Sequence, residues 1–141
     1  INELSSLFLY NVIKDYKFIK KKRISVWNFY FKHLLKLEQS KKIILPKYNF
    51  DNNENASHIF YFFTKRNQRD KLLFFLKANK IKATFHYLPL CMSPFFKNYQ
   101  LSKNLVSESI SKEIIRLPIY PQLSKKQQRY VISKIYKFFN Q

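Results

Sequence analysis

The three histidines, His33, His58 and His86, are the side chains of this sequence that could bind a ligand or exchange a proton near neutral pH. His33 lies within a helical pattern and is interpreted as a surface or boundary residue. His58 precedes a run typical of a strand, and His86 stands beside Tyr87 at the end of another, where side chains often face a cleft. Position alone leaves His86 either a functional residue or a hydrogen-bonded structural one.

No other residues form a recognisable catalytic or metal-binding pattern. The chain has no glycine, which rules out a Gly-rich phosphate-binding loop, and no spacing favours a Ser/His/Asp or Cys/His set. The single cysteine, Cys91, cannot form an internal disulfide, so a reducing compartment, the cytoplasm, is expected. No apolar stretch approaches the ~18 residues that a transmembrane helix needs, and we expect no membrane partner.

The composition indicates one folded and strongly basic domain. With 141 residues, of which 46% are hydrophobic, the chain can bury a single core. Its net charge of +19 raises nucleic acid or an anionic membrane surface as a partner. The charge comes from 22 Lys and only 5 Arg, spread along the chain and accompanied by many residues with A/T-rich codons. Codon bias is therefore an alternative origin of the charge.

The N-terminal part of the sequence has a helical period. Apolar residues three or four positions apart predict one long helix, or two in series, from an N-cap at Asn2 to Leu37. The basic run over residues 20–23 falls within this pattern, either as a solvated helix face or as a binding patch. Pro46 ends the regular structure, and the polar stretch 49–57 is predicted to be a loop.

Short strands alternate with helices in the remainder of the chain. Strands are predicted over residues 59–63, 81–87 and 114–117. Capping boxes that begin at Asn67 and Ser124 predict two helices, the first closed by Asn79 in a left-handed conformation. A Ser-Pro pair at 93–94 is expected to open a short helix, and Ser107 another.

This order predicts an α/β fold of the α+β kind, a short two- to three-stranded sheet covered by helices. The sequence leaves open whether the strands pair parallel or antiparallel. The chain starts at Ile1, inside a helical pattern, so the natural polypeptide is expected to begin upstream.

Several segments, in order along nearly the whole chain, carry a resemblance to a known family. The more specific pair is residues 85–90, Phe-His-Tyr-Leu-Pro-Leu, and residues 116–121, Arg-Leu-Pro-Ile-Tyr-Pro. Residues 2–6, 22–30 and 55–61 add to it. Together they resemble the C-terminal part of the DegT/DnrJ/StrS sugar-nucleotide aminotransferases, and among these most nearly the transaminases that make TDP-4-amino-4,6-dideoxygalactose.

The resemblance implies the C-terminal domain of a fold-type I, pyridoxal-phosphate-dependent aminotransferase. Residues 1–40 would form the interdomain helix or helices and residues 41–141 the small domain, without the N-terminal cofactor-binding large domain. The parent enzyme would be a homodimer that transfers an amino group from glutamate to a TDP-4-keto-6-deoxyhexose for a surface polysaccharide. His58, His86 and Tyr87 are the candidates for binding the nucleotide-sugar, since imidazole and phenol groups hydrogen-bond hydroxyls and diphosphate oxygens.

The same resemblance implies that this chain alone is inactive and binds no cofactor covalently, because the family's Schiff-base lysine lies N-terminal to this region. Cys91 departs from the pattern, since the family commonly has His there and a thiol is a poor hydrogen-bond donor. Glu108 and Arg116 match family positions, with an ion pair or a helix-cap role as the alternative interpretation. Two other functions stay open: a basic nucleic-acid-binding module and a non-functional gene remnant.

Overall fold

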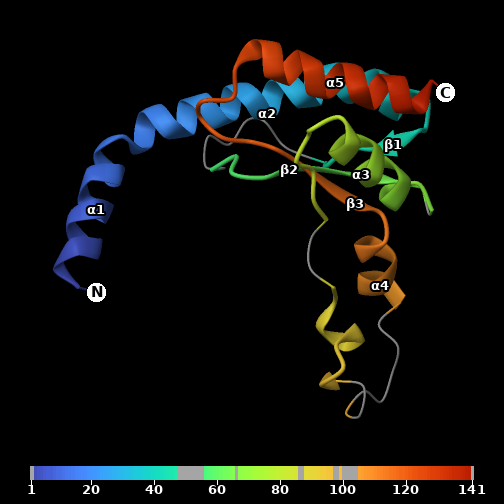
Figure 1. The fold of residues 1–141 in the computed structure, drawn as a ribbon, viewed down its shortest axis with the longest axis horizontal. Helices are drawn as coiled ribbons and strands as arrows, with labels where there is room; N and C mark the ends of the chain where they lie inside the picture. The colour runs from blue at the N-terminus through green and yellow to red at the C-terminus, as the bar shows by residue number, and fades with distance from the viewer. Residues whose placement is uncertain are drawn as a thin grey trace.

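The computed structural model of the protein describes residues 2–47, 56–65, 67–85, 88–96, 99 and 105–140 (Figure 1). Its elements follow in the order α1 (Glu3–Lys14), α2 (Tyr16–Gln39), β1 (Ile43–Ile44), β2 (Phe60–Thr64), α3 (Arg69–Ala78), the 3₁₀ turn η1 (Leu90–Met92), α4 (Leu105–Ser111), β3 (Ile114–Leu117) and α5 (Lys125–Phe139).

The N-terminal pattern forms two helices in series. Asn2 caps α1 as predicted, because its side-chain oxygen accepts the backbone N–H of Ser5 at 2.8 Å. The chain turns at Asp15, whose N–H donates back to the carbonyls of Val12 and Ile13, and α1 then points away from the axis of α2 (Figure 1). No residue of α1 is buried, whereas α2 buries the adjacent Val26 and Trp27 and then, at spacings of three or four, Tyr30, Leu34 and Leu37.

The three strands form one antiparallel sheet in the order β1-β2-β3. The strand predicted over 114–117 is confirmed, and the one predicted over 59–63 lies one residue later. The sequence pattern missed β1, which pairs Ile43 with Thr64 and Ile44 with Phe63. A strand of two residues has no period of its own and is defined only by its partner.

The strand predicted over 81–87 is wrong in its described part. Only Thr84 pairs with β3, through a single bridge to Arg116. The N–H of Ala83 instead donates to the carbonyl of Ile81 at 3.0 Å, and this tight turn interrupts a continuous ladder.

The predicted capping box at Asn67 is also absent. Asn67 has a left-handed backbone with φ of 69°, so it does not have the extended conformation of an N-cap. The N-cap residue of α3 is instead Gln68, which makes no side-chain cap bond. At the other end of α3, Lys80 adopts the left-handed conformation expected of Asn79. The Asn79 side chain donates to the carbonyl of Phe75 at 2.8 Å and so closes the helix in another way.

The short helices follow the prediction in part. Ser93 ends the η1 turn, because its N–H bonds the Leu90 carbonyl at 2.9 Å, and it also caps the next turn as predicted, because its hydroxyl oxygen accepts the N–H of Phe96 at 3.4 Å. Helix α4 begins at Leu105, two residues before the predicted start at Ser107. The capping box of α5 is confirmed: the Ser124 hydroxyl accepts the N–H of Gln127, and the Gln127 side chain accepts the N–H of Ser124.

The core lies between one face of the sheet and the helices. Phe60 and Phe62 of β2, neither of them exposed, pack with Ile115 and Leu117 of β3 against α2, α3 and α5. Helices α2 and α5 lie side by side along this layer (Figure 1). The predicted fold class, a small α/β domain with a short sheet covered by helices, is confirmed.

Candidate functional site

The face of the sheet opposite the helices carries the candidate site. Because successive strand residues point to opposite faces, Tyr61 and Phe63 alternate with the buried Phe60 and Phe62 and are only half-buried. The two rings meet edge to face, with centroids 5.6 Å apart and planes at 76°. This face, called the uncovered face below, is partly open to solvent at Tyr61 and Phe63, whereas Ile114, which pairs with Phe63, is buried.

A row of three different side-chain types crosses the uncovered face. Tyr61 pairs directly with Arg116 of β3, and Arg116 pairs in turn with Thr84. Directly paired residues of antiparallel strands share a face, with Cβ atoms about 5 Å apart. A phenol, a guanidinium and a hydroxyl therefore stand side by side, a combination suited to a ligand with an aromatic part and an anionic part.

His58 is exposed at the entrance of β2. The next residue, Ile59, is held by the indole N–H of Trp27, which donates to its carbonyl at 3.2 Å. Phe60 pairs with Leu117, so His58 lies at the end of the sheet where the chain leaves β3. The other two candidates, His86 and Tyr87, lie outside the described residues, so the three candidates cannot be compared in space.

His33 has the surface position predicted for it. It is exposed on α2, its Nδ1 lies 2.8 Å from the Phe29 carbonyl, and its ring stacks on that of Phe29 with centroids 3.9 Å apart. These contacts are local to the helix.

Arg69 links three segments around the candidate site. Its Nε and one terminal nitrogen bind the carboxylate of Asp70 at 2.9 and 2.8 Å, and the other terminal nitrogen donates to the carbonyl of Ser111. The guanidinium also lies over the ring of Phe85, 4.7 Å from its centroid. Arg69 thus fixes the start of α3, the end of α4 and the segment that precedes residues 86–87.

Cys91, the position that departs from the family pattern, is half-buried with its Sγ 3.6 Å from the hydroxyl oxygen of Ser107. This contact joins η1 to α4. Glu108 and Arg116 form no ion pair with each other. The ion pair found between described residues joins Arg69 and Asp70.

The described residues do not fit pyridoxal phosphate. A Schiff-base lysine is usually activated by a desolvating pocket or by a second cation. The buried polar residues of the described chain are Ser57, Thr64, Ser111 and Gln128, none of them a lysine. No group of His, Cys, Asp or Glu suited to a metal ion occurs in the described ranges either. Within those ranges, no helix has the length and apolarity to cross a membrane.

DesV and NtdA are among the solved structures that share this fold. DesV of S. venezuelae superposes on 95% of this chain with a TM-score of 0.80 and 24% sequence identity, and the match covers 35% of DesV. NtdA of Bacillus subtilis, solved with the cofactor PMP bound, matches 87% of this chain and 29% of its own, with a TM-score of 0.76 and 18% identity. At these identities the similarity establishes the fold.

The sequence identifies the family. Residues 1–136 match the DegT/DnrJ/EryC1/StrS aminotransferase family, and the chain belongs to it. A relative described as a pleiotropic regulatory protein, from Geobacillus stearothermophilus, is 37% identical over 86 residues, which are 58% of this chain and 23% of the relative. The chain thus spans between about a quarter and a third of the length of the proteins that it matches.

The sequence interpretation did not include Tyr61 and Thr84 in the site. Tyr61 lies in a strand with aromatic residues on both faces. The sequence alone does not show which of the two faces the helices cover. The period-2 alternation after residue 81 was a usable signal for Thr84, but its neighbour Arg116 became known only from the pairing.

Proposed function

We propose that this chain is the C-terminal small domain of a pyridoxal-phosphate-dependent aminotransferase acting on a nucleotide-linked sugar. The observation that carries the proposal is the family match over residues 1–136. The uncovered face of the sheet supports it, because an exposed layer of half-buried aromatic side chains is typical of a surface that another domain or a ligand covers.

The finer substrate assignment rests on the motif pair. Residues 85–90 and 116–121 together resemble the family members that use a TDP-4-keto-6-deoxyhexose as acceptor and glutamate as amino donor, for a surface polysaccharide. In this proposal His58, His86 and Tyr87 hydrogen-bond the nucleotide-sugar. The exposed position of His58 at the end of the sheet is compatible with that role.

The cofactor would be held elsewhere in the parent enzyme. When bound, pyridoxal phosphate supplies the electron sink for amino transfer. This chain would cover the cleft and contribute substrate contacts. The large domain, and a second subunit of a cytoplasmic homodimer, would pack against the uncovered sheet face and α1. The chain alone would neither transaminate nor bind the cofactor covalently.

The test is an assay of the native polypeptide, purified from its own cells, with glutamate and a TDP-4-keto-6-deoxyhexose. Production of 2-oxoglutarate is expected, with a slower rate for the UDP-linked sugar. Failure to transaminate any nucleotide-linked keto sugar would contradict the proposal, and salt-dependent retention of an oligonucleotide would then favour the nucleic-acid-binding alternative.

The role of His58 is tested in the same assay. Replacing it by alanine is expected to raise KM for the nucleotide-sugar by about tenfold at most, the effect of one lost hydrogen bond. H33A is the matched control, because His33 is also exposed and its side chain contacts only its own helix, while its bond to Tyr136 of α5 uses the backbone carbonyl. An unchanged KM for H58A would remove His58 from the site.

A further inference from the structure

A small hollow lined by both polar and apolar residues adjoins the row of side chains on the uncovered face. It has a volume of about 310 Å³. Four of its side chains can donate hydrogen bonds: Lys82, Thr84, Arg116 and Tyr120. The remaining described lining residues are Leu117, Pro118 and Ile119, so no acidic side chain is among those described.

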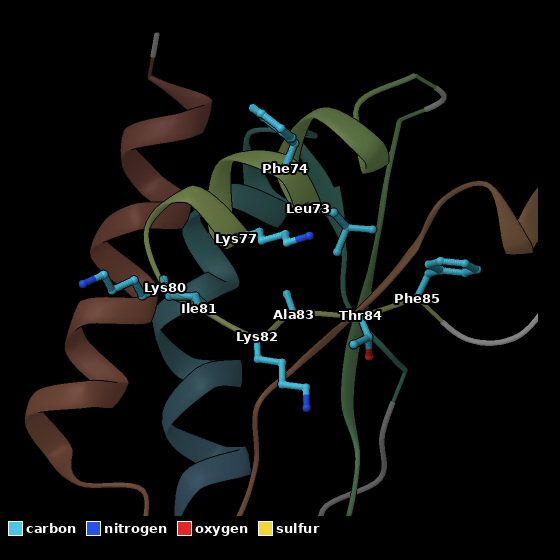
Figure 2. A pocket seen from close by; sticks show the side chains of 9 residues that line it. All are labelled: Leu73, Phe74, Lys77, Lys80, Ile81, Lys82, Ala83, Thr84 and Phe85. Carbon is cyan, nitrogen blue, oxygen red and sulfur yellow. The ribbon is translucent and has the colours of Figure 1, made fainter.

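The backbone brings these four side chains together. Arg116 and Thr84 exchange two backbone hydrogen bonds, of 2.7 and 3.1 Å, which place their side chains on the same face. Lys82 lies two residues before Thr84 and also lines the hollow. Figure 2 shows Lys82 and Thr84 directed to one side and Ala83 to the other, toward α3.

The same segment also borders a second, larger space. Together with α3 it lines a groove of about 810 Å³ whose lining is mainly apolar, and Lys80, Lys82 and Thr84 all border this groove. The Lys80 side chain points away from Lys82 and from Thr84 (Figure 2). The segment therefore carries two lysines, two positions apart, of which only Lys82 lines the small hollow.

The two cations of the hollow have no counter-charge in the described chain. Arg116 is half-buried, and no described residue forms an ion pair or a side-chain hydrogen bond with its guanidinium or with the Lys82 ammonium. Two like charges that border one hollow repel each other, and an anion between them relieves that repulsion. The hydroxyls of Thr84 and Tyr120 also make no hydrogen bond with a described residue through their side chains, which leaves both available to a ligand.

This donor set matches a diphosphate better than a single carboxylate. Arginine binds phosphate oxygens through two parallel N–H groups, and lysine adds a point charge. Two cations and two hydroxyls suit a group with two adjacent phosphates and several acceptor oxygens. Tyr61, next to Arg116 in the row, offers a ring on which a base attached to that diphosphate can stack.

We propose that the hollow formed by Lys82, Thr84, Arg116 and Tyr120 binds the diphosphate group of the nucleotide-sugar. The identity of the whole ligand rests on the proposed function, whereas diphosphate binding rests on the hollow itself. Arg116 and Lys82 hold the phosphates, and the Tyr61 side of the row receives the nucleoside.

The first experiment titrates the 141-residue chain with inorganic pyrophosphate by calorimetry in about 0.15 M salt, where charges more than about 8 Å apart are screened. R116Q is expected to weaken binding by about tenfold or more, because it removes a bidentate charged contact. K82Q is expected to weaken it by about threefold, since an exposed lysine contributes less.

The matched control is K80Q, which removes the same charge from the same segment on the other side. A loss below about twofold is expected for it. Equal losses in K80Q, K82Q and R116Q would overturn the proposal, because they would show diffuse attraction to a chain of net charge +19. Lys82 is exposed, so K82Q keeps the test valid even if R116Q lowers stability.

The second experiment separates the hollow from the proposed function. Thymidine diphosphate is expected to bind more tightly than pyrophosphate, and Y61L is expected to remove that difference while leaving pyrophosphate affinity unchanged. Equal affinity for thymidine diphosphate and pyrophosphate would overturn the proposal that the nucleoside binds beside Tyr61. If the native enzyme transaminates but R116Q leaves KM unchanged, the hollow proposal fails alone. If pyrophosphate binds selectively while no keto sugar is transaminated, the proposed function fails alone.

Discussion

Arg69 illustrates how much one side chain can organise in a domain without glycine. Its guanidinium binds a neighbouring carboxylate, a distant carbonyl and an aromatic ring, although only 15% of the side chain is exposed. Asp70, its partner, has 79% of its side chain exposed. The carbonyl of Ser111 and the ring of Phe85 therefore account for most of the stabilisation that Arg69 provides.

We predict that R69A lowers the free energy of unfolding by ~2 kcal/mol, because a partly buried hydrogen bond to a charged donor is lost. D70N should cost less than ~1 kcal/mol, since an exposed ion pair contributes little. Urea unfolding of both variants measures the difference. Equal losses would mean that the ion pair, not the contact with Ser111, holds the segments together.

Tyr30 supplies a pH-dependent contribution to stability. It is fully buried and donates its hydroxyl to the carbonyl of Pro118 at 3.0 Å. Burial, and secondarily the nearby Tyr120, raises the pKa of Tyr30 far above its ordinary value. The folded state then keeps this proton at a pH where the unfolded state releases it, so the stabilisation is complete below about pH 10 and is lost as the pH rises above it.

We predict that the wild-type chain loses stability above about pH 10 more steeply than Y30F, by up to ~1.4 kcal/mol per pH unit. The difference in the free energy of unfolding between wild type and Y30F removes the contribution of every other titrating group. Y130F is the control, because Tyr130 donates to Asn79 at 3.3 Å but is 45% exposed. Parallel pH curves for wild type and Y30F would refute the assignment.

At the scale of elements, α5 depends on its N-terminal cap. The Ser124 and Gln127 pair satisfies N–H groups that the first turn leaves without partners. S124A is expected to cost ~1 kcal/mol in thermal unfolding. S133A is the matched control, because Ser133 is exposed within the same helix and bonds only the carbonyl of Tyr130. Because alanine favours a helix interior more than serine does, S133A should lose no stability. A loss as large in S133A would show that the effect is not specific to the cap.

The two capping patterns also show what the sequence could predict. Ser124 follows a proline-rich bend and has the extended backbone of an N-cap, so the local pattern was sufficient. Asn67 has the same kind of pattern, but the turn after β2 imposes a left-handed backbone there. Long helices and the strand over 114–117 were predictable from period and capping. The sequence could not predict β1 or the single bridge at Thr84, because each exists only through pairing with a distant segment. The hollow beside Thr84 could therefore not be predicted either.

At the scale of the whole molecule, charge and exposed apolar surface oppose each other. The basic side chains are spread over several helices, with Lys17, Lys71 and Lys126 all exposed on different ones, so the charge repels other copies from every side. Helix α1 extends away from the rest of the molecule with none of its residues buried (Figure 1). Its large hydrophobic side chains with at least 60% exposure are Leu4, Leu7, Phe8, Tyr10 and Ile13.

We predict that the chain self-associates through α1 once its charge is screened. Sedimentation velocity should show monomers at low salt and larger species at about 0.5 M salt, where screening shortens the range of repulsion and the apolar surface can be buried. F8S should keep the chain monomeric, because Phe8 is 73% exposed on α1. F74S is the matched control, since Phe74 is 77% exposed but lies on α3. If F74S prevents association as well as F8S does, the contact is a general property of exposed aromatic side chains; if only F8S does, α1 is the surface that a large domain or a second subunit would cover.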